Sequence, residues 1–195
     1  MTSNRGPARS PRRLPLSRVA LLMAAGLTLP VFAGAAGARV LTLVVPVRGM
    51  TCALCTRGVE ESVKSLGGMT ATADLAAARV RVEAGEGRSL VIRDVKERVL
   101  SAGFGIGGEC EVTAAGRFQI GPDRQLTFRI HQSPYVFQVL EGNQLRRMFR
   151  LFPGLKGEFR IAFRLHEHPN WKPPAIAITA FEAIAGPPPA SRTGR

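Results

Sequence analysis

Strand-like and helix-like apolar patterns alternate in a fixed order between residues 39 and 114, and this order limits the fold more than any other feature of the chain. Valine and leucine dominate the segment RVLTLVVPVR, which predicts a strand with Pro46 at its end or at a bulge. Apolar residues then recur every three or four positions, which predicts a helix that Gly67-Gly68 ends. Two strands, a second helix and a last strand follow, over residues 69–75, 78–82, 91–99 and 104–112. The order β-α-β-β-α-β predicts an α+β domain of the ferredoxin-like type.

A different pattern begins at Gly116. Short runs rich in β-branched and aromatic residues are separated by turn residues, which predicts a small β-rich domain, a barrel of about five strands. Residues 144–152 fit either a helix or a bent strand. We therefore expect four parts: an export signal (1–38), the α+β domain (39–114), the β-rich domain (115–186) and a disordered tail (187–195).

The amino-terminal segment has the features of an export signal. Five arginines and no acidic residue precede an apolar run of 14 residues, VALLMAAGLTLPVF. After this run, Ala36-Gly37-Ala38 forms a cleavage pattern of small residues. A run of this length is short for a permanent membrane span. We expect a periplasmic protein without a stable span after cleavage, and an uncleaved membrane anchor is the alternative.

The net charge of +13 raises the question of a nucleic-acid partner. Without the five arginines of the first 38 residues, 22 basic residues face 14 acidic ones, which leaves +8 (27 − 5 − 14). The remaining arginines are scattered and often alternate with apolar residues, which is typical of the solvated faces of strands. We expect no nucleic-acid partner.

Two thiols separated by two residues lie where the first strand passes into the first helix. Cys52 and Cys55 can converge on one ion there, and a thiolate is the form of cysteine that binds metals. The start of a helix has unpaired N–H groups and a positive dipole end, which we expect to favour the thiolate of Cys55 in particular. Sulfur ligands select soft ions such as Cu(I) and, by the same logic, Hg(II). Zinc is disfavoured because its structural sites need about four ligands and no histidine occurs between residues 39 and 130.

The segment Gly49-Met50-Thr51-Cys52-Ala53-Leu54-Cys55 resembles the metal loop of the heavy-metal-associated domain family. That family includes periplasmic mercury-binding proteins, copper chaperones and the amino-terminal modules of copper-transporting ATPases. The resemblance covers residues 39–114 and includes the order of elements and Gly103-Phe104. It implies a ferredoxin-like fold, one Cu(I) or Hg(II) ion held by two sulfurs in near-linear geometry, and transfer to a membrane transporter or another metal-binding domain.

The residues around the two cysteines have expected supporting roles. Met50 is expected to point into the core beneath the loop, because buried methionine usually fills gaps. Thr51 occupies a plausible helix-capping position. The resemblance places Phe104 near the metal loop, where it either shields the thiolates or packs in the core. Gly49 is part of the same motif.

Other residues leave alternatives open. Cys110 has no partner at ligand spacing and is expected to be a buried thiol. His166 and His168 share one face if they lie on one strand, so they form a possible second metal site, with two solvated histidines as the alternative. No nucleophile–base arrangement is evident, so we expect no enzyme. We expect an exported binder of one soft metal ion; the alternatives are a thiol–disulfide redox protein using the C-x-x-C pair, or an adaptor acting through the β-rich region.

Overall fold

The computed structural model describes residues 39–121, 123–130, 133–168 and 171–185. All of them belong to one compact unit that begins at Ala36. The expected export signal (1–38) and disordered tail (187–195) lie outside the described residues. None of the helices within the described ranges is long and apolar enough to cross a membrane.

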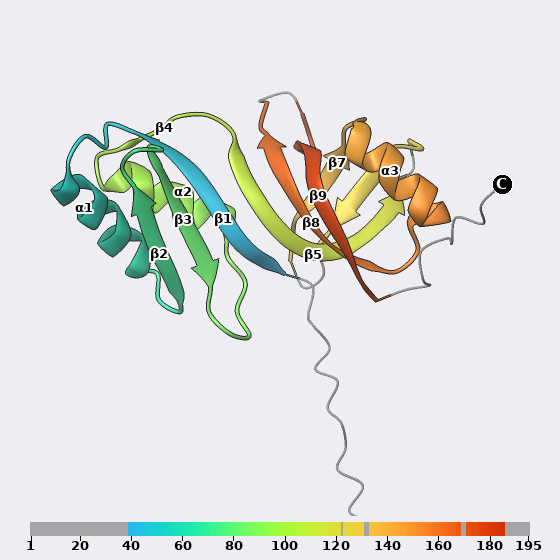
Figure 1. Cartoon of the computed structure of the whole chain (residues 1–195), viewed down its shortest axis with the longest axis horizontal. Coiled ribbons are helices and arrows are strands. Elements are labelled where there is room, and N and C mark those ends of the chain that lie inside the picture. The colour runs from blue at the N-terminus through green and yellow to red at the C-terminus, as the bar shows by residue number, and fades with distance from the viewer. Residues whose placement is uncertain (1–38, 122, 131–132, 169–170, 186–195) are drawn as a thin grey trace, which may run out of the picture. The chain divides into compact units, whose positions relative to one another are not determined.

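The first half of the unit has the expected β-α-β-β-α-β order (Figure 1). Its antiparallel strands lie in the order β2-β3-β1-β5, and the two helices lie side by side, linked by the hydroxyl of Ser62, which donates to the carbonyl of Arg98 (3.0 Å). This confirms a ferredoxin-like α+β arrangement. The elements are β1 (Val40–Arg48), α1 (Ala53–Lys64), β2 (Met69–Asp74), β3 (Arg79–Ala84), α2 (Ile92–Ser101), the short β4 (Gly105–Ile106) and β5 (Cys110–Ile120).

Valine at helical spacing builds the core of this half. Val59 and Val63 of α1 and Val95 and Val99 of α2 are fully buried, as the periodicity predicts. They face alternate residues of β1 and β3, among which Leu43, Val45, Val80 and Val82 are also fully buried. One apolar layer therefore fixes both helices on a single face of the sheet.

Two details of this half differ from the sequence prediction. The last strand, expected over residues 104–112, is interrupted after Ile106. The N–H of Gly107 still donates to the carbonyl of Pro46 (2.8 Å), in register with the Val47–Ile106 pair, but Pro46 has no N–H with which to return the bond. Pro46 itself lies inside β1, and the bulge lies elsewhere, between Val40 and Thr42. Pro46 is tolerated because its nitrogen, like its carbonyl, faces Gly107, where the pairing of β1 with β4 has already ended.

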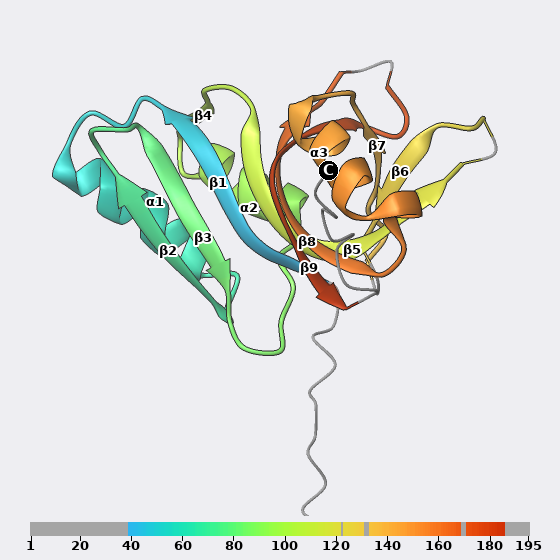
Figure 2. The same ribbon diagram turned by 45° about the vertical axis from the view of Figure 1, so that its right-hand side comes forward.

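The second half is a closed five-stranded barrel (Figure 2). The strand order is β5-β6-β7-β9-β8, and β8 pairs with β5 to close the ring. The β7–β9 pair is parallel and the other pairs are antiparallel. With α3 inserted between β7 and β8, this connectivity is that of the OB-fold, a small Greek-key barrel. The remaining elements are β6 (Leu126–Arg129), β7 (Val136–Val139), α3 (Asn143–Leu151), the 3₁₀ turn η1 (Pro153–Leu155), β8 (Glu158–His166) and β9 (Ala175–Ala185).

Phenylalanine fills the barrel. The ring of Phe128 lies 5.1 Å from that of Phe118 and 6.4 Å from that of Phe163, and the ring of Phe137 lies 5.3 Å from that of Phe163. Phe128, Phe137 and Phe163 are at most 1% exposed. Tilted and edge-to-face contacts of this kind are the favoured geometries of aromatic pairs. Most of the ten phenylalanines of the chain lie in this half, so its core is aromatic where that of the first half is aliphatic.

Strand β5 belongs to both halves. Its first part pairs with β1, with Val112 opposite Leu43, and its last part pairs with β6, with Phe118 opposite Phe128. Figure 1 shows the strand curving from the sheet into the barrel. The domain boundary expected between residues 114 and 115 therefore lies within a continuous strand.

Candidate metal centre

The two cysteines lie at the exposed start of α1. Strand β1 ends at Arg48, and the chain turns through Gly49 with a φ of 89°, a value that favours glycine. Cys52 has extended backbone angles (φ −146°, ψ 161°) and is the N-cap of α1. Cys52 is exposed and Cys55, one helical turn further, is half-buried. The loop therefore leaves Cys52 more exposed to solvent than Cys55.

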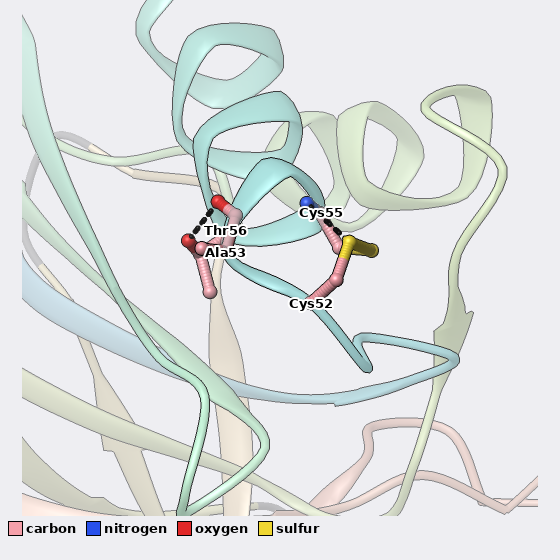
Figure 3. Close-up of a disulfide and its surroundings, with 4 residues drawn as sticks. All are labelled: Cys52, Ala53, Cys55 and Thr56. Carbon is pink, nitrogen blue, oxygen red and sulfur yellow. Dashed lines mark hydrogen bonds between the residues drawn. A yellow bond between two sulfur atoms is a disulfide. The ribbon is translucent and has the colours of Figure 1, made fainter.

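The first turn of α1 places a backbone donor against one of these sulfurs. The N–H of Cys55 donates to the Sγ of Cys52 (3.2 Å; Figure 3). The hydroxyl of Thr56 donates to the carbonyl of Ala53 (2.7 Å), and the N–H of Thr56 donates to the carbonyl of Cys52 (3.2 Å). No acidic residue occupies the first turn of α1. The helix dipole and an N–H donor thus act on the sulfurs without a competing carboxylate in that turn.

The role of the helix start differs from the expectation in two respects. Thr51 was expected at the cap, but Cys52 is the N-cap and Thr51 is an exposed residue before it. The backbone donor was expected to favour Cys55 in particular, but the acceptor is the Sγ of Cys52. The reason is local: Cys52 is the last residue with extended angles, so only its side chain can reach back over the first turn.

The two sulfurs are joined as a disulfide, with the Cα atoms 5.1 Å apart (Figure 3). The side chains therefore converge on one point, as a two-coordinate ion requires. A disulfide is the two-electron oxidised form of the ligand pair, and reduction restores the two thiols. Within the described ranges no group of three or more His, Cys, Asp or Glu side chains is arranged to hold a metal ion. The donor set at this loop is two sulfurs, which fits a soft ion.

Met50 and Phe104 connect the metal loop to the apolar core. Met50 is 5% exposed and belongs to the core, as expected. Phe104 is half-buried and packs on the same core, and its Cδ1 lies 4.0 Å from the position that a Cβ on Gly49 would occupy. Phe104 thus borders the metal loop, where it can both pack and cover one side of it.

Sequence reasoning did not identify Glu60, which fastens the metal-loop helix to the sheet. Its carboxylate accepts from the N–H of Ala73 on β2 (2.8 Å) and pairs with Lys64 (3.2 Å). The backbone hydrogen bond from Ala73, followed by the contact with Lys64, lowers the pKa of Glu60 against the opposing effect of burial. The Glu60–Lys64 spacing of four was a visible helix signal, but the bond to Ala73 depends on the packing of α1 on β2.

The other candidate residues lie outside this centre. His166 ends β8 and pairs through Nδ1 with Glu109, and His168 lies beyond the strand with its ring 5.5 Å from that of Trp171. The common strand on which the possible second metal site depended therefore ends before His168. Cys110 is a free thiol, 3% exposed, at the start of β5. Burial raises the pKa of Cys110 to about 11.

Comparison with known proteins places the first half in a family. Residues 44–105 match the sequence profile described as "Heavy-metal-associated domain". No functionally curated protein matches the chain. Two solved structures are each similar to about a third of the chain. One is a copper-binding domain of a P-type ATPase (30% identity, 37% of this chain, 92% of that chain, TM-score 0.31). The other is a candidate copper-ion-binding protein from Bacillus anthracis str. Ames (28% identity, 36% of this chain, 96% of that chain, TM-score 0.30).

The matched segment contains the metal loop, α1, β2, β3 and α2, which are the elements that place Cys52 and Cys55. Through residues 44–105, the chain belongs to the heavy-metal-associated domain family.

Proposed function

We propose that this protein is an exported, non-catalytic carrier that holds one soft metal ion, Cu(I) or Hg(II), between Cys52 and Cys55. It passes the ion to a membrane metal transporter or to another metal-binding domain. The observation that carries the proposal is the convergence of two sulfurs at the exposed, positively polarised start of α1, within a heavy-metal-associated domain. The expected export signal favours action in the periplasm.

Loading of the site requires reduction. A dithiol reductant gives two electrons and two protons to the Cys52–Cys55 disulfide and is itself oxidised to a disulfide. The two thiols then lose their protons as their sulfurs bind the ion, so metal binding releases two protons. The N–H of Cys55 and the dipole of α1 favour this ionisation at Cys52.

Release of the ion proceeds by ligand exchange. A thiolate of the acceptor approaches the exposed side of the loop, where Cys52 lies, and binds the ion as a third sulfur ligand. One of the two original sulfurs then leaves, and a second acceptor thiolate displaces the other. Exposure of the loop makes the exchange fast, whereas two sulfur ligands keep the affinity for a soft ion high.

The experiment is an anaerobic titration of reduced protein, residues 39–195, with Cu(I), Hg(II) and Zn(II) in competition with a thiol chelator. We expect one equivalent of Cu(I) or Hg(II) to bind and zinc to be left with the chelator. The double variant Cys52→Ser/Cys55→Ser should lose tight binding because both ligands are removed. The matched control is Cys110→Ala, which removes the third cysteine and should retain the full stoichiometry. Stoichiometric metal binding by the double variant would contradict the proposal.

The disulfide itself favours a second candidate function, that of a thiol–disulfide redox protein. Such a protein would accelerate the reduction of insulin disulfides by a small dithiol and would not hold Cu(I) or Hg(II) against a chelator. A carrier gives the opposite pair of results. Both assays use the same reduced sample, so one preparation decides between the two functions.

A further inference from the structure

Helix α3 and the turn after it form the most one-sided charged segment of the barrel. Residues 142–157 contain four basic residues and no acidic one. The four basic side chains and the aromatic residue between them are exposed, and we call them the α3 basic surface: Arg146, Arg147, Phe149, Arg150 and Lys156.

The packing of α3 turns this set of residues outward. Leu145 and Met148 are 7% and 0% exposed and seat the helix on the barrel. Figure 2 shows α3 lying against the barrel. Arg146, Phe149 and Arg150 are three and four residues apart, so they are neighbours on the opposite, solvent-facing side. Phe149 is 46% exposed there, although its size and apolarity would favour burial.

The charges of this surface are not neutralised, unlike those of three arginines on the barrel strands. On the strands, Arg117 pairs with Glu158, Arg160 with Glu182 and Arg164 with Glu111. On α3 the contacts are neutral: Arg146 donates to the Oδ1 of Asn143 (2.8 Å), and the guanidinium of Arg147 lies 5.7 Å from the centre of the Phe181 ring. Within the described ranges, none of the four basic side chains of the surface lies within ion-pair distance of a carboxylate.

We propose that the α3 basic surface binds the anionic headgroups of a phospholipid bilayer. Four uncompensated cations complement an anionic surface, and each basic residue near such a surface strengthens binding appreciably. Phe149, exposed among the arginines, can enter the headgroup region when these arginines bind the anionic headgroups. A nucleic-acid strand is a poorer fit because base stacking uses successive aromatic platforms and this surface offers one ring. The proposal goes beyond the metal-carrier function and uses none of its residues.

The test is sedimentation of the protein, residues 39–195, with vesicles that contain phosphatidylglycerol and with vesicles of phosphatidylcholine alone. We expect binding to the anionic vesicles only, and we expect added salt to weaken it. The double variant Arg146→Gln/Arg150→Gln should lower the vesicle partition coefficient by at least about tenfold, because two of four cations are lost.

The matched control is Arg98→Gln/Arg124→Gln, which removes the same two charges from exposed positions elsewhere. Arg98 lies in the last turn of α2 as Arg150 lies in the last turn of α3. The control should bind vesicles as the unaltered protein does. An equal loss in both double variants would show a general charge effect and overturn the proposal.

Further variants and ligands distinguish lipid binding from the binding of other partners. Phe149→Ser should weaken vesicle binding, while Leu100→Ser, at a site 51% exposed, should not. Binding to a single-stranded oligonucleotide or to polyglutamate in the absence of vesicle binding would overturn the lipid assignment. The Cys52→Ser/Cys55→Ser variant should bind vesicles fully, so failure of the metal proposal and failure of this one are distinguishable.

Discussion

At the scale of single residues, the three cysteines of the chain have two different chemistries. Cys52 and Cys55 lie at an exposed helix start, where the N–H of Cys55 donates to the Sγ of Cys52. Cys110 lies in the apolar core at the start of β5, where burial raises its pKa from 9.0 to about 11. Position in the fold, rather than residue type, therefore separates the two proposed ligands from the buried thiol.

The raised pKa of Cys110 predicts a loss of stability at high pH. Because the folded protein holds the thiol neutral, its contribution is complete below about pH 9 and is lost as the pH rises toward about 11. The shift corresponds to a fall in the free energy of unfolding on the order of 2–3 kcal/mol. Urea unfolding of the disulfide-bonded protein at several pH values measures it. Cys110→Ala lacks the titrating group, so an equally steep decline in that variant would contradict the prediction.

At the scale of elements, β5 depends on a glycine where it enters the barrel. Gly116 is the last residue of β5 that pairs with β8, opposite Phe159, and Arg117 begins the pairing with β6. A Cβ on Gly116 would lie 2.8 Å from Cζ of Phe128 and would also collide with the carbonyl of Arg129. The close approach of β6 to β5, which starts the closure of the barrel, thus requires the absence of a side chain.

Gly116→Ala should therefore destabilise the protein. Forcing one methyl group against the backbone of β6 should lower the free energy of unfolding by roughly 1–3 kcal/mol. The matched control is Gly58→Ala on α1, where nothing lies within 4 Å of the added Cβ. Alanine at an exposed helix interior should raise stability by about 0.5–1 kcal/mol. Urea unfolding followed by far-ultraviolet circular dichroism gives both values, and a neutral Gly116→Ala variant would show that β6 can shift without cost.

At the scale of the whole described unit, the barrel supplies contacts that stabilise helix α2 of the first half. Helix α2 has Val91 as its N-cap, with no side-chain hydrogen bond to its first turn. The hydroxyl of Tyr135, from the segment before β7, accepts from the N–H of Ile92 instead (2.9 Å). The ion pair between Lys96 and Glu167 adds a second link from α2 to the barrel. The second half therefore supplies the cap that the sequence of α2 lacks.

Tyr135→Phe should remove this cap while preserving the aromatic ring, which stacks on Phe137 at 5.8 Å. A partly buried N–H then loses its acceptor, so the free energy of unfolding should fall by about 1 kcal/mol. Val91→Asp in the same background adds an N-cap acceptor within α2 and should recover part of the loss. Urea unfolding followed by circular dichroism gives both changes. If the double variant recovers no stability, the Tyr135 hydroxyl does not act as a helix cap.

The same links predict that both halves unfold together. The circular dichroism of the helices and the fluorescence of Trp171, the one tryptophan of the chain, in the barrel half, should report one transition in urea. Separate midpoints for the two signals would mean that neither these links nor the shared strand β5 couples the unfolding of the halves.

The sequence by itself determined the elements of the first half and its metal loop. Valine spacing defined α1 and α2, and the adjacency of Cys52 and Cys55 at a strand–helix junction defined the proposed ligand pair, because both signals depend only on near neighbours. The aromatic runs indicated a barrel of about five strands, but residues 144–152 remained ambiguous until the barrel buried Leu145 and Met148 of α3.

Tertiary structure alone decided how β5 is shared, how the barrel closes, and which groups cap the helices. The pairing of β5 with β1, β6 and β8 joins residues far apart in the chain, and the Tyr135–Ile92 bond spans 43 positions. The spacing of residues along the chain does not indicate such contacts, since any extended segment with an apolar face can pair with several others. The close approach at Gly116 and the burial of Phe128 and Phe163 select the observed pairing, and these exist only once the chain has folded.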